Sequence, residues 1–237
     1  SRIYPTLAFG ALSSYLTASQ QALLASNGPS VLVNNITTPT MLIAGTPDTL
    51  FPLRQAVTNA QILNANGVPV RLIWACGAGG HGTCLASENP SQRQFLVDST
   101  FAWLDRYVKG NELVPTGPRF EWYDQDGVLH SSDLLPSDPA FHGQSVVTSG
   151  AGGFLPIVPL VGGSGPVTQE PVWQFIVTTL ASRARLAVNV DVAIADQPVQ
   201  IVGPAELNFT YSGFGTARHI FAQLVDEDTG LVLGNIV

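Results

Sequence analysis

Two residue types that can act together in acid–base catalysis each follow an apolar segment of this 237-residue chain. Asp48 stands in "GTPDTLFP", directly after the apolar run "PTMLIAG" (39–45), and His81 stands in "CGAGGHGTC" (76–84), directly after "VPVRLIWA" (68–75). A carboxylate beside an imidazole fixes the tautomer of the ring and stabilises its protonated form, as a general base requires. The two residues therefore predict the acid and the base of a nucleophilic hydrolysis mechanism.

Both residues depend on the elements that precede them. The two apolar runs are typical of strands buried on both faces, and residues 51–67 between them have apolar side chains at helical spacing, ending at Gly67. A further helix is expected over residues 91–110. This order of elements predicts a parallel βαβ unit with a right-handed crossover. Because functional loops leave the carboxyl ends of such strands, we expect Asp48 and His81 to be spatial neighbours.

The character of the chain changes after Gly110. A linker-like stretch leads to an expected strand over residues 119–123, and residues 133–170 are rich in Gly, Pro and Ser, which predicts a long loop. From residue 185 onward, apolar and polar residues alternate, as in "LAVNVDVAI" and "ELNFTY", which is typical of short antiparallel strands in a β-sandwich. We therefore expect an α/β part over residues 1–112 and an all-β part over residues 113–237, the latter ending within a strand.

Cys76 and Cys84 bracket the histidine loop and leave three interpretations open. A structural zinc site takes four protein ligands, and only these two thiols and His81 are at hand, so we expect no metal. Free thiols or a disulfide remain. We favour the Cys76–Cys84 disulfide, which would hold the loop rigid and stabilise the fold by about 2–3 kcal/mol.

Composition excludes several classes of function. Charged residues make up 11% of the chain, the net charge is −7, and Lys109 is the only lysine, so nothing here could neutralise a phosphate backbone. No apolar run reaches the roughly 18 residues that span a bilayer, and the first residues do not resemble a signal peptide. We expect no cofactor. The low charge and the Ser/Thr-rich surface favour a secreted or cell-surface protein, with a cytoplasmic one as the alternative.

The segments quoted above, with "FLVDSTFAWLDRYVKG" (95–110) and "TGPRFEWYDQDG" (116–127), resemble the back half of one type of α/β-hydrolase. It is the cocaine-esterase and glutaryl-acylase type, which also includes X-Pro dipeptidyl-peptidases. "ARLAVNVDVAI" and "IFAQLVDEDTGLVLGN" are similar to the jelly-roll domain that follows the hydrolase domain in that family. The resemblance implies the C-terminal part of an α/β-hydrolase sheet plus a jelly-roll-like β-sandwich. It also implies Asp48 as the triad acid and His81 as the triad base.

The nucleophilic serine of that family, on a G-x-S-x-G elbow before the acid and the base, has no counterpart upstream of Asp48. "GGSGP" around Ser164 lacks the final glycine and follows the histidine, and Ser13 and Ser14 have no elbow context. We therefore hypothesise a portion of a serine hydrolase for small ester, amide or X-Pro peptide substrates. It would be inactive alone and would require an N-terminal portion that carries the serine.

Two alternative interpretations of the chain involve no catalysis. The chain could be a non-catalytic module whose β-sandwich binds carbohydrate or a protein, or a fragment that does not fold alone.

The remaining polar and aromatic residues are assigned structural roles. "YDQDG" (123–127) and "DEDTG" (226–230) indicate hairpin turns rather than calcium loops. Three further histidines have no nearby partners in the sequence, and we expect them to lie on the surface or to have their hydrogen bonds satisfied locally: His130, His142 and His219. Core positions are expected for Phe95, Phe101, Trp74 and Trp103, and core burial is favoured over pocket lining for Trp122 and Trp173.

Overall fold

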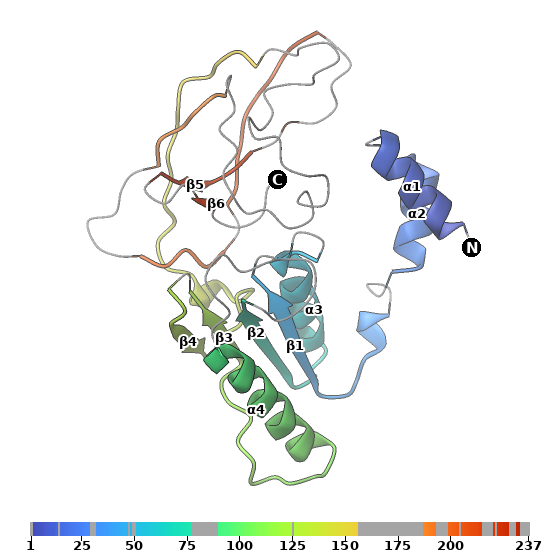
Figure 1. Ribbon diagram of the computed structural model, residues 1–237, viewed down its shortest axis with the longest axis vertical. Helices are drawn as coiled ribbons and strands as arrows, with labels where there is room; N and C mark the ends of the chain where they lie inside the picture. The colour runs from blue at the N-terminus through green and yellow to red at the C-terminus, as the bar shows by residue number, and fades with distance from the viewer. Residues whose placement is uncertain are drawn as a thin grey trace.

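The computed structural model describes residues 2–13, 15–28, 32–46, 48, 51–76, 90–124, 126–155, 187–192, 199–203, 205–214, 220, 222–227 and 231–232. Figure 1 shows the elements in chain order. The helices are α1 (Ile3–Ser13), α2 (Ala18–Ser26), α3 (Leu53–Ala65) and α4 (Pro90–Tyr107), with short 3-10 helices η2 (Val33–Asn35) and η3 (Pro139–Phe141). The strands are β1 (Thr40–Gly45), β2 (Val70–Ala75), β3 (Phe120–Tyr123), β4 (Leu129–Ser132), β5 (Val225–Asp226) and β6 (Leu231–Val232).

Strands β1 to β4 form one mixed sheet in the order β1-β2-β3-β4. β1, β2 and β3 are parallel, with α3 connecting β1 to β2, whereas β4 pairs with β3 in antiparallel fashion. The expected strand–helix–strand unit is thus confirmed, as are the helix over 91–110 and the strand over 119–123. β3 and β4 lie beyond residue 112 and extend the same sheet.

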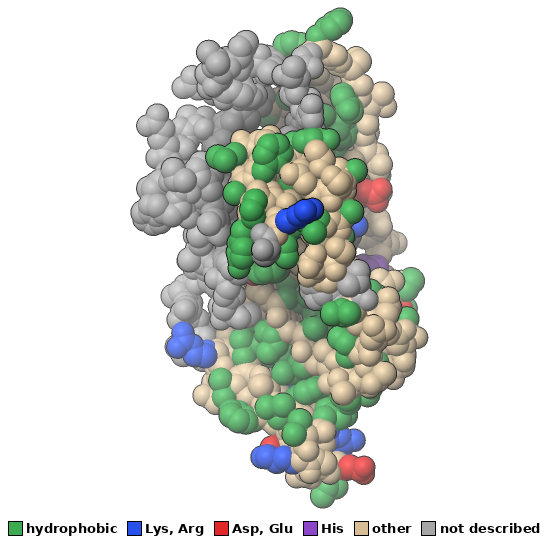
Figure 2. Space-filling model, turned by 90° about the vertical axis from the view of Figure 1, so that its right-hand side faces the viewer, with side chains coloured by type: hydrophobic (Ala, Val, Ile, Leu, Met, Phe, Trp, Pro, Cys, Tyr) green, Lys and Arg blue, Asp and Glu red, His purple; other side chains and the backbone are tan. Residues whose placement is uncertain are grey.

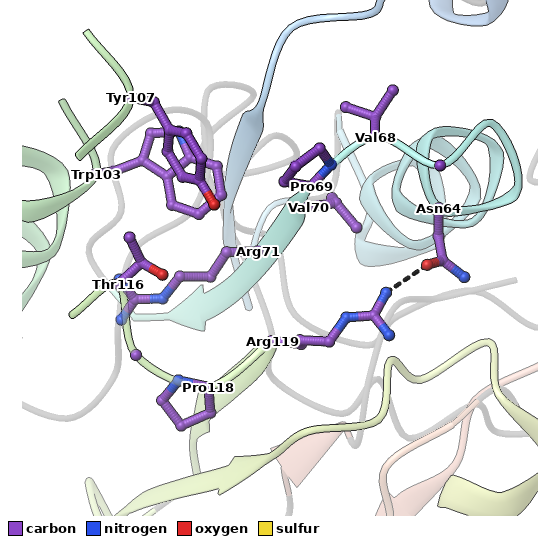
Figure 3. A pocket seen from close by; sticks show the side chains of 12 residues that line it. Asn64, Val68, Pro69, Val70, Arg71, Trp103, Tyr107, Thr116, Pro118 and Arg119 are labelled. Carbon is purple, nitrogen blue, oxygen red and sulfur yellow. Dashed lines mark hydrogen bonds between the residues drawn. The ribbon is translucent and has the colours of Figure 1, made fainter. Parts of the chain in front are cut away.

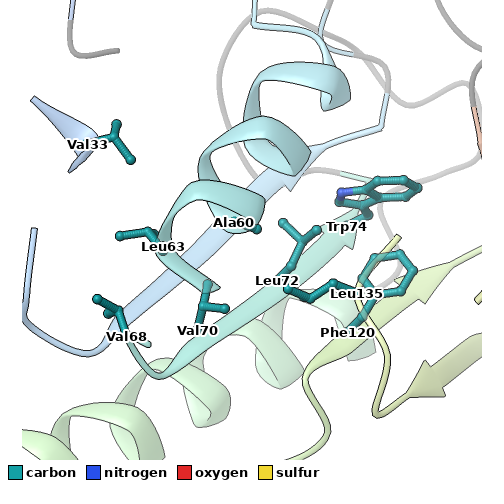
Figure 4. Packing of buried hydrophobic residues seen from close by; sticks show 9 residues of the cluster. All are labelled: Val33, Ala60, Leu63, Val68, Val70, Leu72, Trp74, Phe120 and Leu135. Carbon is teal, nitrogen blue, oxygen red and sulfur yellow. The ribbon is translucent and has the colours of Figure 1, made fainter. Parts of the chain in front are cut away.

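The hydrophobic core lies between the sheet and α3 (Figure 4). β2 lies inside the sheet, and all of its residues are buried, in agreement with its largely apolar sequence, in which Arg71 is the one charged residue. Alternate side chains of β2 and β3 point toward α3, where each fully buried large side chain contributes about 1.5–3 kcal/mol. The cluster consists of Val33, Ala60, Leu63, Val68, Val70, Leu72, Trp74, Phe120 and Leu135.

Helix α4 turns a partly polar side toward the other face of the sheet. Gln92 and Ser99 are each 6% exposed, and Trp103 is buried beside them, as expected from the sequence. Ser99 is buried because its hydroxyl oxygen accepts a hydrogen bond from the Arg71 guanidinium at 3.1 Å. The same guanidinium lies 5.9 Å from the ring centroid of Phe95. A buried arginine on β2 therefore decides which side of α4 faces the sheet.

A second stripe of apolar residues, along α4 and the residue that follows it, is exposed. Val97, Phe101, Leu104 and Val108 recur at helical spacing and are 41%, 62%, 42% and 75% exposed. The expectation that Phe101 belongs to the core is wrong. The helical spacing predicted from the sequence is correct. The side of α4 that faces the sheet is the one that contains Ser99, which bonds to Arg71, and not the one that contains Phe101.

Helices α1 and α2 contact each other in a hairpin before the sheet begins. α2 starts at a capping box in which Thr17 and Gln20 satisfy each other's backbone N–H groups. α1 has no charged residue, and its Tyr4 and Leu12 are 78% and 89% exposed. Figure 2 shows hydrophobic side chains across this helix pair. None of the described helices combines the length and the hydrophobicity that crossing a membrane requires.

The later part of the chain has little regular structure among its described residues. Residues 142–155 form neither helix nor strand, as expected from their Gly and Ser content. A second segment, 187–192, lies against them, and a Cβ at Gly150 would come within 2.7 Å of Val190. The alternation in this segment was expected to mark a strand, but its described residues join no ladder. The glycines at 150 and 153 have no side chains that could cover this segment, and its Val188, Val190 and Val192 are 38–42% exposed.

The last described elements are β5 and β6, which pair in antiparallel fashion. β5 includes the first residue of the "DEDTG" stretch, which is expected to be a hairpin turn, and β6 directly follows that stretch. The jelly-roll-like sandwich stays a prediction, because residues 156–186 and most of 215–237 lie outside the described part.

Candidate active site

Asp48 lies at the carboxyl end of β1 and is 7% exposed. Its backbone N–H donates to the carbonyl of Gly45 at 3.2 Å, which turns the chain sharply off the strand. Its side-chain Oδ1 accepts a hydrogen bond from the backbone N–H of Phe51 at 2.8 Å. The carboxylate is therefore buried and held in a fixed orientation before α3 begins.

The root of the histidine loop lies directly beside this turn. β1 and β2 are in parallel register with Gly45 opposite Ala75, and the N–H of Thr46 donates to the carbonyl of Ala75 at 3.2 Å. Cys76 follows at once and is half-buried. The structure thus brings Asp48 and the start of the "CGAGGHGTC" loop to the same edge of the sheet. His81 itself lies outside the described residues, so its contact with Asp48 stays a prediction.

The disulfide also stays a prediction. Cys76 is described and Cys84 is not. The described part of the chain contains one of the two cysteines and therefore does not test the bridge. In the same described part, no group of three or more His, Cys, Asp or Glu residues is arranged to hold a metal ion.

Trp74 also lies at this edge of the sheet. The sequence predicts it only as a core residue. It is the next-to-last residue of β2, is 8% exposed, and packs edge-on against Phe120 with ring centroids 4.8 Å apart. Its indole N–H has no hydrogen-bond partner among the described residues. A buried donor without an acceptor is costly, so this N–H is available to a group that comes to the edge of the sheet. No pattern in the sequence distinguishes it from an ordinary core tryptophan.

Two histidines expected to lack nearby partners have them. His130 Nε2 lies 2.8 Å from Asp124 Oδ2, and the side-chain amide nitrogen of Gln200 lies 3.1 Å from Nδ1. His142 Nε2 lies 2.8 Å from the carbonyl oxygen of Pro136. Of these contacts, the one between His130 and Gln200 joins the β3–β4 hairpin to a later segment. His219 and Trp173 lie outside the described residues.

Trp122 occupies the face of the hairpin that carries His130. It is half-buried, in partial agreement with the expected core burial. Its ring stacks on Phe120 with centroids 4.7 Å apart and on the His130 imidazole with centroids 5.4 Å apart. The imidazole therefore links the Asp124 carboxylate, the Gln200 amide and the Trp122 indole.

The "YDQDG" stretch is a hairpin turn, as expected from the sequence. Asp124 Oδ1 accepts hydrogen bonds from the backbone N–H groups of Asp126 and Val128 at 2.9 Å and 2.8 Å. Burial alone would raise the pKa of Asp124. The hydrogen bonds from His130 and from the two backbone groups outweigh it and hold the pKa below its usual value.

This lowered pKa predicts an acid-dependent contribution to stability. A carboxyl group with a depressed folded-state pKa stabilises the fold above its unfolded value, about 3.9, and that stabilisation is lost as the pH falls through the folded value. Asp124→Asn should therefore lower the free energy of unfolding by about 1 kcal/mol at pH 7, and by progressively less as the pH falls through the folded-state value. Urea unfolding over a series of pH values from 7 downward measures this. The exposed Asp126→Asn in the same turn is the control, and an equal effect of both variants would contradict the prediction.

Comparisons with known proteins identify no relative: no family model, no curated protein and no solved structure matches this chain.

Proposed function

We propose that this chain supplies the acid and the base of a serine hydrolase, with Asp48 as the acid and His81 as the base. The observation that carries the proposal is the placement of Asp48. It is a buried carboxylate in a fixed orientation at the carboxyl edge of a parallel sheet, beside the root of the loop that contains His81. Catalytic residues of open α/β sheets lie at this edge.

In the proposed reaction His81 removes the proton from a serine hydroxyl as its oxygen attacks the carbonyl carbon of an ester or amide. It then gives that proton to the leaving group, and a water molecule later releases the acyl group by the same route. Asp48 holds the ring in the required tautomer and stabilises the imidazolium. The resemblance stated above favours small esters, amides and X-Pro peptides as substrates.

The serine would come from a further, N-terminal portion of the hydrolase, and the edge strand supports such a partner. β1 has apolar residues in a row at Met41, Leu42 and Ile43, as a central strand has, yet most of it is only half-buried, and Ile43 is 38% exposed. Edge strands are normally protected by charges, proline or bulges, and β1 contains no charge and no proline. A sheet that continues past β1 would bury these residues.

We also propose that Cys76 and Cys84 form a disulfide that restrains the histidine loop, in a secreted or cell-surface protein. Glycines on both sides of His81 let the chain turn sharply but cost conformational entropy on ordering. A bridge across this loop would lower that cost by restricting the unfolded chain.

A fluorophosphonate probe tests the proposed hydrolase in the assembled protein that contains this chain. Such probes react only with an activated serine, so we expect labelling that His81→Ala reduces by several orders of magnitude in rate. His142→Gln is the matched control, since it alters a histidine bonded to Pro136 and should leave labelling unchanged. Equal labelling of the wild type and His81→Ala would refute the proposal, and sugar-dependent shifts without any labelling would favour a binding module instead.

A further inference from the structure

A pocket of about 330 Å³ opens at the edge of the sheet opposite to Asp48 (Figure 3). It lies at the amino-terminal ends of β2 and β3, between the end of α3 and the end of α4. Its volume is at the lower end of the range for small-molecule sites. Because the proposed catalytic residues belong to the carboxyl edge, this pocket does not depend on the hydrolase proposal.

The charged side chains that line the pocket are all positive. Its lining contains two arginines, Arg71 and Arg119, and no aspartate or glutamate. Arg71 is already neutralised, because its guanidinium forms a buried ion pair with Glu121. It is also held from the other side, since a Cβ at Gly117 would come 2.9 Å from its terminal nitrogen. Arg71 therefore forms a fixed wall rather than a binding group.

Arg119 keeps its charge. Its guanidinium donates to the side-chain oxygen of Asn64, which is neutral, and among the described residues no carboxylate lies within ion-pair distance of it. A guanidinium has five N–H donors in a planar fork that matches a carboxylate, so most of them remain for a ligand. In a chain with a net charge of −7, an uncompensated arginine in a hollow attracts anions.

The other side of the pocket is aromatic. Trp103 and Tyr107 extend from α4 with ring centroids 4.5 Å apart and planes tilted by 53°. Figure 3 shows this aromatic pair across the pocket from Arg119, and Pro69 and Pro118 complete the apolar wall. Aromatic rings favour edge-on or offset contact with another ring. The ligand should thus have an apolar ring at one end and a negative charge at the other.

We propose that this pocket binds a small aromatic carboxylate, with the carboxylate on the Arg119 guanidinium and the ring against Trp103 and Tyr107. A charge-assisted, two-pronged contact at Arg119 would fix the orientation, and the rings would select an aromatic body over an aliphatic one. Benzoate is the simplest probe of this class.

Saturation-transfer NMR on the full chain, with benzoate as the probe, tests the site. We expect benzoate to bind with a dissociation constant in the millimolar range or below, and Arg119→Gln to weaken it at least tenfold. Arg54→Gln, on the exposed surface of α3, is the matched control and should change nothing. Benzylammonium, with the same ring and the opposite charge, should not compete.

The aromatic part has its own test. Tyr107→Leu should weaken benzoate several-fold but leave cyclohexanecarboxylate, which has no aromatic ring, unchanged. If Arg119→Gln does not fold, as judged by circular dichroism, Arg119→Lys keeps the charge without the fork and should weaken benzoate less than tenfold. The proposal is overturned if wild type shows no benzoate binding, if Arg119→Gln binds as well as wild type, or if inorganic phosphate displaces benzoate at equal concentration.

Discussion

Replacing Asp48 with asparagine should lower kcat of the assembled hydrolase by about four orders of magnitude while the fold stays intact. In the proposed mechanism, the carboxylate stabilises the imidazolium of His81 when the serine proton is transferred. An amide of the same shape has no charge and favours the wrong tautomer of the ring. Steady-state hydrolysis of p-nitrophenyl esters by the assembled protein measures the loss.

The fold should survive because asparagine keeps the acceptor that the turn requires. Oδ1 of the asparagine can still accept the hydrogen bond that the N–H of Phe51 donates to Asp48 at 2.8 Å. Asp48→Ala would remove that acceptor and should cost about 0.5–1.5 kcal/mol of stability as well, the usual contribution of one hydrogen bond. Asp138→Asn is the control, because its Oδ1 caps η3 in a similar way by accepting from Ala140. If Asp48→Asn retains full kcat, Asp48 is a turn residue and not the triad acid.

Elements fixed by local pattern were predictable from the sequence. The strands β1 and β2 follow from their largely apolar runs, and α3 and α4 follow from helical spacing with glycine stops. The expected burial on both faces holds for β2 but not for β1, most of which is half-buried. The parallel pairing of β1 with β2 then follows from the length of the connection between them. For the same reason Asp48 could be assigned in advance to one edge of the sheet together with the start of the His81 loop.

Features set by contacts between distant segments were not predictable. Helical period alone cannot show that Ser99 rather than Phe101 faces the sheet, because the choice depends on Arg71, 28 residues earlier. The contact of His130 with Gln200 spans 70 residues. Alternation likewise shows which side chains share a face, but not whether a neighbouring strand is there to pair with them.

The pair of Arg71 with Glu121 leads to the second large effect. Both side chains are buried, at 5% and 8% exposure, and the guanidinium bonds to a single carboxylate oxygen through two of its nitrogens. Removing one partner of a buried pair leaves the other charge without compensation, which typically costs 3–5 kcal/mol. Glu121→Gln, which keeps the shape and loses the charge, should therefore lower the free energy of unfolding by about 3 kcal/mol.

An exposed pair supplies the comparison. Lys109 and Asp105 form an ion pair one helical turn apart, with the lysine 71% exposed, and Lys109→Gln should change stability by less than about 0.5 kcal/mol. The double variant Arg71→Met/Glu121→Leu removes both buried charges and should recover most of the loss, because it leaves no charge unpaired. Urea unfolding of the three variants separates the two cases. A Glu121→Gln variant no less stable than Lys109→Gln would show that the buried pair contributes nothing.

Tyr123 reports on the same charge without any measurement of stability. Burial and, secondly, the negative charge of Glu121 raise the pKa of its phenol above the usual value. Glu121→Gln removes the second cause and leaves the first, so the phenol should titrate at a lower pH than in the wild type as long as the fold persists. A spectrophotometric titration, with Tyr123→Phe used to assign the signal, measures the shift. An unchanged titration would mean that burial alone raises the pKa of this phenol.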